Sequence, residues 1–293
     1  MLLYCCETVV PGRLFDSAVP LSLALYGQAK TAWGNCSTGA MSFFLLTGVT
    51  SGIGSVVLCR CLADGHTVCA VVRSDEQRQR LRQAYPDNLD IEVAELADRV
   101  QVSDLVARLQ SRTFDYVLLN AGCAQIGAYH EQSMDDIDTV MQANLLSNMQ
   151  IVHGLLPMIR RQRARVIFVS SIVARVPGRD YAAYAVSKAG LSHFYAALSL
   201  EYPEIPMLCV EIGPVHTDFH EKAKLQLESR RGFKAQDLIG NRLYDAMLRR
   251  TGVTTLAFDW ACGRLLLMSL EDIVHRVLRR RSARRRATAL QSP

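Results

Sequence analysis

The chain has 293 residues, of which 49% are hydrophobic and 21% are charged. It can therefore bury a full core as one large domain or two small ones, and a globally disordered protein is excluded. The net charge is +5, but residues 276–293 carry seven arginines and no acid, so the rest of the chain is close to neutral.

The first 42 residues match none of the patterning that follows, and we treat them as an amino-terminal extension without an assigned role. No apolar run in the sequence reaches the roughly 20 residues that a membrane-spanning helix needs. Met1 is not followed by a basic stretch, so a secretory signal is not expected. The nine cysteines include no CxxC pair and no Cys/His cluster at metal-ligand spacing. They indicate thiols in a reducing compartment, which predicts a cytoplasmic protein without a metal site.

From residue 43 onward, short β-branched runs alternate with amphipathic helical stretches. The predicted strands are residues 43–47, 67–72, 89–93, 115–120, 165–170 and 206–212, and the predicted helices are residues 52–64, 75–84, 102–111, 134–162, 181–201 and 235–250. Several strands are apolar throughout, as expected for strands covered on both faces. This alternation predicts an α/β fold with a doubly wound, Rossmann-like parallel sheet. We expect a single domain over residues 43–274 and a basic tail over residues 275–293.

The first strand–helix junction reads TGVTSGIG (47–54), with glycines at Gly48, Gly52 and Gly54. Glycines allow the backbone to turn sharply and to approach a pyrophosphate, while the free N–H groups of the helix start attract its charge. A glycine-rich turn of this kind alone is weak evidence for a nucleotide. It nevertheless marks the carboxyl end of the first strand as a candidate phosphate site.

The end of the second strand carries Arg73 where a carboxylate would select NAD(H) by binding the adenosine ribose. A guanidinium can instead hold a 2′-phosphate through two parallel hydrogen bonds. The sequence therefore predicts NADP(H) in preference to NAD(H). The alternative is that Arg73 is a solvated arginine at a strand end.

Six motifs follow one another in order: TGVTSGIG (47–54), LNAG (119–122), ANLLS (143–147), FVSSIV (168–173), YAVSK (184–188) and GPVHTDF (213–219). In this order and spacing the chain resembles the short-chain dehydrogenase/reductase family over about residues 43–220. Two positions depart from the family pattern. Leu119 replaces an asparagine, and Glu95 and Leu96 stand where the family commonly has an aspartate and an aliphatic residue near the adenine.

The resemblance implies a catalytic set of Asn144, Ser171, Tyr184 and Lys188. A carbonyl that receives a hydride needs a proton donor on its oxygen, and Lys188, one helical turn after Tyr184, is expected to lower the pKa of that phenol. Ser171 would donate a hydrogen bond to the substrate oxygen, and Asn144 would hold a water that links Lys188 to solvent. The implied cofactor contacts are Gly48, Thr50, Ser51, Gly52, Ile53, Gly54, Arg73, Asn120, Ala121, Gly122, Tyr184, Lys188, Pro214, Val215 and Thr217.

Some neighbouring residues compete for these roles. Ser170 could replace Ser171, although the family spacing to Tyr184 selects Ser171. Tyr181 and Tyr195 have no lysine four residues later, and His216 has no serine–acid arrangement beside it. We expect the two tyrosines to pack in the core or to form pocket walls, and His216 to make a loop hydrogen bond. No GxSxG elbow is present, which argues against a nucleophilic hydrolase.

The carboxyl end (residues 254–278) reads as a possible strand that runs into an apolar helix. With GPVHTDF and Arg73, it looks most like the branch that contains 17-beta-hydroxysteroid and retinol dehydrogenases. The run RRRSARRR (279–286) could contact a membrane surface or nucleic acid. A disordered, solubilising tail is the preferred explanation, and no nucleic-acid partner is expected.

These observations predict an NADP(H)-dependent oxidoreductase that interconverts a secondary alcohol and a carbonyl on a lipophilic, steroid- or retinoid-like substrate. The resemblance further implies a homodimer or homotetramer. Three rival hypotheses stay open: a 3-oxoacyl thioester reductase on the same scaffold, a non-catalytic nucleotide sensor, and a surface scaffold that acts through its arginine tail.

Overall fold

The computed structural model describes residues 41–85, 87–176, 178–217 and 233–256. A seven-stranded parallel sheet with the order β3-β2-β1-β4-β5-β6-β9 forms its centre. The strands are β1 (Phe43–Thr47), β2 (Thr67–Val72), β3 (Leu89–Val93), β4 (Tyr116–Leu119), β5 (Arg165–Ser171), β6 (Met207–Ile212) and β9 (Gly252–Leu256), with a separate two-residue pair of β7 (Val215–His216) and β8 (Lys234–Ala235). The helices are α2 (Gly52–Ala63), α3 (Asp75–Ala84), α4 (Arg99–Leu109), α5 (Met134–Met141), α6 (Ser147–Gln162), α7 (Ala182–Glu201) and α9 (Gln236–Arg249), with the short turns η1 (Tyr129–Glu131) and η3 (Ile172–Ala174) and the π-helical segment η2 (Gln142–Leu146).

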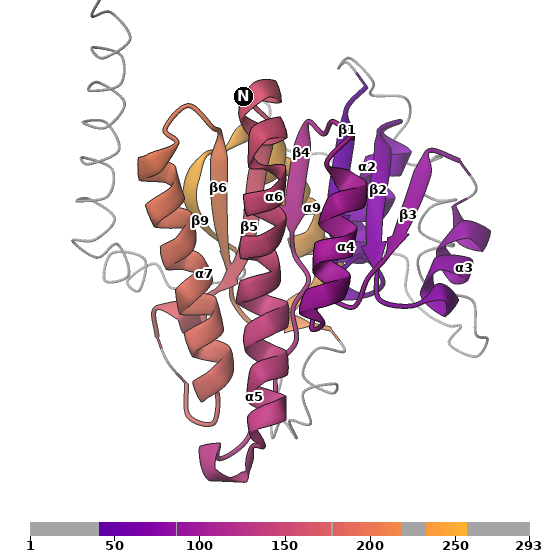
Figure 1. Ribbon diagram of the computed structural model, residues 1–293. Helices are drawn as coiled ribbons and strands as arrows, with labels where there is room; N and C mark the ends of the chain where they lie inside the picture. The colour runs from indigo at the N-terminus through magenta and orange to yellow at the C-terminus, as the bar shows by residue number, and fades with distance from the viewer. Residues whose placement is uncertain (1–40, 86, 177, 218–232, 257–293) are drawn as a thin grey trace, which may run out of the picture.

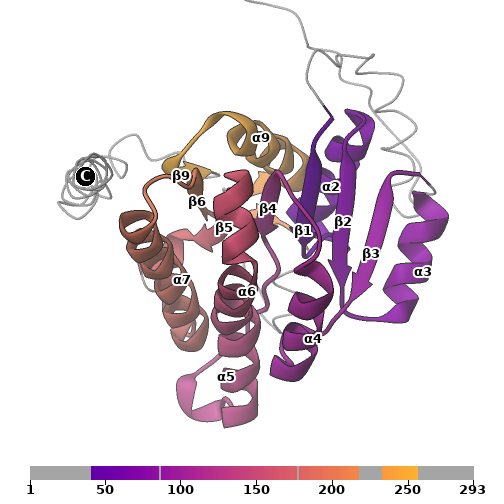
Figure 2. The same cartoon turned by 45° about the horizontal axis from the view of Figure 1, so that its top comes forward.

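Helices cover both faces of the sheet, as Figures 1 and 2 show. Helices α4, α6 and α7 pack on one face through a core that includes Leu105, Leu155 and Leu191. Helices α2 and α9 pack on the other face through a second core. Alternate residues of each strand enter opposite cores: Leu45 of β1 faces the first and Leu46 the second. Burial on both faces explains why these strands read as continuous apolar runs.

The predicted doubly wound parallel sheet is confirmed. Strands β1, β2 and β3 and helix α3 begin and end at the predicted residues, and the helix predicted over residues 134–162 keeps both of its ends. The other predicted strands and helices differ from the structure by a few residues at their ends. A last strand, β9, adds to β6 in parallel, in the region where a possible strand was predicted. The apolar helix predicted after it, the extension (1–42) apart from its last two residues, and the basic tail lie outside the described residues. None of the helices in the described part of the chain has the length and apolar character that a membrane span requires.

One predicted helix, residues 134–162, is divided by the π-helical segment η2. A side chain from the following turn stabilises this wider turn: Asn148 Nδ2 donates to the Asn144 backbone carbonyl at 2.8 Å. A π-helical turn inside an α-helix often marks a functional site. Here it carries Asn144.

The strand order fixes where a ligand can bind. The chain runs outward from β1 through β2 to β3, then returns to place β4 on the other side of β1. The loops after β1 and β4 therefore leave the sheet in opposite directions and open a crevice between them. Both loops carry predicted site residues, Gly48 after β1 and Asn120 after β4.

Candidate active site

A cleft of about 900 Å³ follows the carboxyl ends of the strands. It is lined by residues at or just beyond the ends of six strands, among them Gly48, Arg73, Glu95, Asn120, Ser171 and Gly213. Every residue predicted from the sequence to act in catalysis or cofactor binding lines this cleft, with the exception of Asn144.

The glycine turn is built so tightly that side chains are excluded from it. Gly48 has a φ of +69°, and a Cβ atom there would lie 2.6 Å from the Ala121 Cα. A Cβ on Gly54 would lie 2.0 Å from the Gly48 carbonyl oxygen. Helix α2 starts beside this turn without an acidic residue in its first turn, which leaves its positive end favourable for an anion.

Asn120 braces the glycine turn. Its side-chain Nδ2 donates to the backbone carbonyls of Thr47 (3.2 Å) and Gly48 (2.8 Å). The Thr47 hydroxyl in turn accepts from the backbone N–H groups of Asn120 and Ala121, both at 3.0 Å. The loops after β1 and β4 are thus joined across the crevice by the Nδ2 group of Asn120 and the hydroxyl of Thr47.

The far end of the cleft contains the residues predicted to select the cofactor. Arg73 is exposed directly after β2, and its backbone N–H donates to Gln77 Oε1 at 3.1 Å. Both residues line the cleft. Glu95 also lines it, and its carboxylate accepts from the Ala97 backbone N–H at 3.1 Å, while Leu96 is buried.

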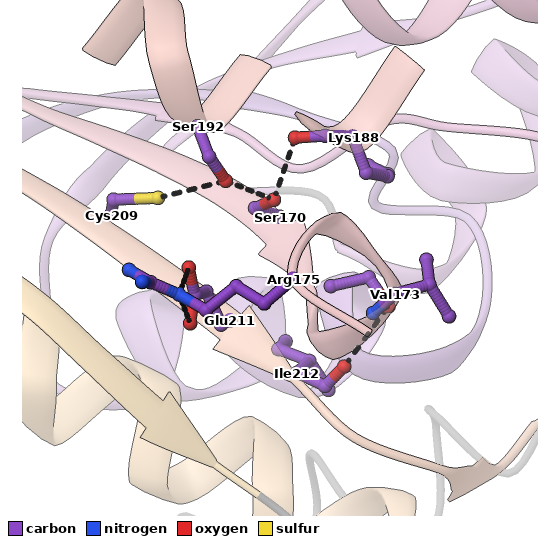
Figure 3. Close-up of polar contacts among 9 residues, drawn as sticks. Ser170, Val173, Arg175, Lys188, Ser192, Cys209, Glu211 and Ile212 are labelled. Carbon is purple, nitrogen blue, oxygen red and sulfur yellow. Dashed lines mark hydrogen bonds and ion pairs between the residues drawn. The ribbon is translucent and has the colours of Figure 1, made fainter. Parts of the chain in front are cut away.

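The two candidate serines at the end of β5 have different environments. Ser170 Oγ donates to the Lys188 backbone carbonyl at 3.1 Å and lies 2.7 Å from Ser192 Oγ, so it connects β5 to α7 (Figure 3). Ser171 is hydrogen-bonded to the side chain of Tyr184, and its Oγ also donates to the Ile212 carbonyl at 3.2 Å. The geometry favours Ser171 over Ser170 as the partner of Tyr184.

Tyr184 is buried, with 8% of its surface exposed. Burial raises the pKa of its hydroxyl to about 12, against a smaller opposing effect of the Ser171 hydrogen bond. A pKa lowered below the ordinary value, as expected from the proximity of Lys188, is not found: the pKa of Tyr184 is raised, and burial is the largest cause. Lys188 Nζ donates to the Val169 carbonyl at 3.0 Å and lies over the phenol ring, 5.9 Å from its centroid. The largest effect on the pKa of Tyr184 is the loss of hydration that its phenolate form suffers on burial.

Lys188 is equally enclosed, with 4% of its surface exposed. Burial lowers the pKa of its ammonium group to about 8. Gly122 makes room for this ammonium, because a Cβ at that position would lie 3.2 Å from Nζ. The lysine remains charged at neutral pH but by a narrower margin than a surface lysine.

Asn144 lies behind the cleft and organises the loop after β4. Its Oδ1 accepts from the Cys123 N–H at 2.8 Å, and its Nδ2 donates to the Cys123 carbonyl (2.8 Å) and to Ser187 Oγ (2.9 Å). Its side chain is therefore held by protein on both sides. The predicted water between Asn144 and Lys188 stays a prediction.

Three features escaped the sequence prediction. Cys123 lines the cleft beside Lys188, and extending the LNAG motif by one residue would have included it. Phe233, which also lines the cleft, contacts the ring of His216 in a tilted arrangement, with 5.3 Å between ring centroids, although His216 itself is exposed. Glu211 is buried in β6, where a single acidic letter inside the run PMLCVEI was the signal. Across the described residues, no cluster of His, Cys, Asp or Glu could hold a metal ion.

Comparison with known proteins identifies the family to which this chain belongs. The model of the short chain dehydrogenase family matches residues 42–228. The 3-oxoacyl-[acyl-carrier-protein] reductase FabG of Rickettsia prowazekii is 30% identical over 181 residues, which are 61% of this chain and 74% of the relative. The NADP-dependent 3-hydroxy acid dehydrogenase YdfG of Escherichia coli is 26% identical over 174 residues, covering 58% of this chain and 70% of the relative.

A solved short-chain dehydrogenase from Sphingobium yanoikuyae, in complex with NADPH, superimposes with a TM-score of 0.70. It is 22% identical, and the match covers 78% of this chain and 92% of that structure. This likeness confirms the fold. The family match covers more than half of the chain, so this protein belongs to the short-chain dehydrogenase/reductase family and is an oxidoreductase acting on CH–OH donors.

Proposed function

We propose that this protein interconverts a secondary alcohol and a carbonyl with NADP(H), using Tyr184 as the acid/base and Ser171 as a hydrogen-bond donor to the substrate oxygen. The observation that carries the proposal is the hydrogen bond between these two side chains, in the same cleft as the glycine turn. Lys188, on the same helix as Tyr184, contributes positive charge at the base of this cleft.

The residues present fit a dinucleotide. The backbone turn at Gly48 and Gly54 leaves no space for a side chain, as close approach of a pyrophosphate requires. Gly52 lies against Thr217, where an added Cβ would be 3.3 Å from the Thr217 Cγ2 atom. We propose that Thr50, Ser51 and Ile53 complete the phosphate end of the site, and that Asn120, Ala121 and Gly122 hold the adjoining ribose. Pro214, Val215 and Thr217 would contact the nicotinamide carboxamide.

The proton chemistry follows from the site. A nicotinamide bound in this cleft would supply hydride for reduction of the carbonyl carbon and would take it up in oxidation. Tyr184 gives its proton to the carbonyl oxygen as negative charge develops there, which completes the alcohol. The Ser171 hydroxyl turns from the Ile212 carbonyl toward the same oxygen and stabilises that charge. A phenol with a pKa of about 12 is protonated at neutral pH, so the resting site is poised for reduction.

The proton that Tyr184 loses has to be replaced. Lys188 is the nearest candidate donor, because its ammonium lies over the phenol ring and its lowered pKa makes proton release easier. Asn144, held beside Cys123, would position a water that returns a proton to Lys188.

Arg73 supports a preference for NADP(H). It occupies the end of β2 without a neighbouring carboxylate on that strand, and its position in the cleft suits a 2′-phosphate. The name of YdfG as an NADP-dependent dehydrogenase and the NADPH bound in the Sphingobium structure agree with this choice.

The substrate end of the cleft is apolar and supports a lipophilic carbonyl compound of the steroid or retinoid class. Ala124, Val173 and Tyr181 line this end of the cleft and, together with Ile126, pack against Tyr184. A 3-oxoacyl thioester is the second candidate, favoured by the similarity to FabG. Both substrate classes present a carbonyl oxygen to the same Tyr184 hydroxyl.

Replacing Tyr184 by Phe tests the proposed function. The variant should bind NADPH as the wild type does, whereas turnover should fall by about 10²–10⁴-fold because the proton donor is lost. NADPH oxidation against steroid, retinoid, short-ketone and 3-oxoacyl thioester panels measures turnover and identifies the substrate class. Tyr116→Phe is the matched control, since Tyr116 stacks on Phe44 within the sheet and lies outside the cleft. Full activity of Tyr184→Phe would refute the assignment. If the wild-type protein binds NADPH but turns over no substrate of the panels, the nucleotide-sensor alternative is favoured.

A further inference from the structure

A carboxylate is buried inside the sheet beside the candidate site. Glu211 lies on β6, between β5 and β9, with 3% of its surface exposed. A buried carboxylate is costly unless a partner compensates its charge. Arg175 supplies that partner, and its Nε lies 2.7 Å and 2.8 Å from the two oxygens of Glu211 (Figure 3).

This ion pair holds one end of the turn that leads out of Ser171. Arg175 directly follows η3, and its backbone N–H donates to the Ile172 carbonyl at 3.0 Å. At the other end of η3, Ser171 Oγ accepts from the Val173 N–H at 3.4 Å and donates to the Ile212 carbonyl at 3.2 Å. Two consecutive residues of β6, Glu211 and Ile212, therefore hold both ends of one short turn.

We propose that Arg175 and Glu211 are positioning residues of the active site, which fix η3 so that the Ser171 hydroxyl faces Tyr184. The inference rests on the proposed role of Ser171. Ile172 and Val173 of the same turn line the cleft, so the turn that the ion pair holds is part of the candidate active site.

Stability alone is a weak reason for this arrangement. A buried ion pair stabilises a fold no better than a well-packed apolar pair of similar volume. The ion pair instead fixes the position of Arg175 relative to β6, because both carboxylate oxygens of Glu211 contact the Arg175 Nε. It thereby restricts the path of the chain after Ser171. A displacement of the order of 1 Å in such a group lowers turnover strongly.

A double-mutant cycle tests the proposal. The first change is the joint replacement Arg175→Met/Glu211→Met, which removes both charges together and leaves neither one buried and uncompensated. The second change is Ser171→Ala. With wild-type Ser171, the joint replacement should lower kcat and kcat/KM for the carbonyl substrate equally, by about 10- to 100-fold, and leave the KM for NADPH unchanged. With Ser171→Ala already present, it should cause less than about a twofold further loss, because its effect passes through Ser171.

Equal losses in both backgrounds would overturn the proposal, since a general structural role adds independently of Ser171. If the joint replacement does not fold, Arg175→Lys and Glu211→Gln enter the same cycle, and the same non-additivity is expected. Arg108→Met is the matched control, because it removes the partly exposed ion pair with Glu92 on β3 and should leave turnover unchanged. Wild-type activity in Ser171→Ala itself would instead refute the proposed function of Ser171, and this inference with it.

Discussion

Burial controls the charge of the two ionisable side chains at the centre of the cleft. It raises the pKa of Tyr184 to about 12 and lowers that of Lys188 to about 8. At neutral pH the phenol therefore keeps its proton while the ammonium keeps its charge. Tyr184 can therefore donate a proton at neutral pH, whereas neither Tyr184 nor Lys188 can accept one. Oxidation of an alcohol should accordingly need higher pH than reduction of a ketone.

Lys188→Met should raise the free energy of unfolding at pH 7 by about 2 kcal/mol. The lowered pKa of Lys188 corresponds to a desolvation cost of about 3 kcal/mol, which the variant avoids. The variant also loses the hydrogen bond to the Val169 carbonyl, which contributes about 1 kcal/mol. Urea denaturation at several pH values measures the difference, and turnover should be abolished in the same variant.

The pH dependence of this gain has a definite sign. Below pH 8 the lysine is charged in both the folded and the unfolded chain, so the cost is fully present. Between pH 8 and 10.5 the folded protein loses its proton first, and the wild type gains stability relative to the variant. A gain that stays constant up to pH 10 would show that charge burial is not its cause.

The junction between β1 and α2 is tightly constrained by its neighbours. The glycine turn is closed on one side by α2 and on the other by the Asn120 brace from the loop after β4. Neither loop can move without breaking hydrogen bonds to the other. We therefore expect the phosphate end of the site to be preformed before any ligand binds.

Gly54→Ala should destabilise the protein by at least about 3 kcal/mol and abolish NADPH binding, because the added Cβ would overlap the Gly48 carbonyl. Gly65→Ala is the matched control. Gly65 has a φ of +83° and no atom within 4 Å of an added Cβ, so only backbone strain of about 1 kcal/mol is expected there. Thermal unfolding and NADPH titration compare the two variants. Similar losses in both would mean that steric exclusion does not govern the turn.

Most elements could be predicted from the sequence because their signals are local. The runs at 43–47 and 67–72 are apolar on both faces and bounded by turn residues, which fixes their ends. The π-helical segment η2 could not be predicted, because no letter in ANLLS breaks a helix and the wider turn depends on Asn148. The raised pKa of Tyr184 could not be predicted either, because its largest cause is burial by residues that are distant in sequence. The pairing of Arg175 with Glu211, 36 positions apart, also depends on the folded sheet.

At the scale of the whole molecule, the strand order gathers residues from all along the domain into one cleft. Positions 48 and 233 both line it, although 184 residues separate them along the chain. A ligand in this cleft bridges the loops of both halves of the sheet and should stabilise the fold as a unit. The homodimer or homotetramer implied by the family resemblance stays a prediction.

NADPH at 100 times its Kd should raise the free energy of unfolding by about 2.7 kcal/mol and the Tm by roughly 5–10 °C. Arg73→Asp should remove most of this shift for NADPH and leave the shift from NADH unchanged or larger, because a carboxylate repels the 2′-phosphate and can bind a ribose hydroxyl. Differential scanning fluorimetry with both dinucleotides measures the effect. Equal losses for the two would mean that Arg73 does not contact the phosphate. Arg82→Asp, on the following helix α3 and outside the cleft, is the control.

Strand β9 contributes no residue to the cleft, yet it shields the far side of β6 through five paired positions. The Leu256 carbonyl also accepts from the Gly213 N–H at 2.8 Å, just where β6 enters the cleft. A shortened chain that ended before residue 252 would leave β6 as an open border, prone to recruit strands from other molecules. Water would then reach the neighbourhood of Glu211 and screen its attraction to Arg175. Loss of this last strand should thus harm enzyme activity and solubility together, even though every reacting group would still be encoded.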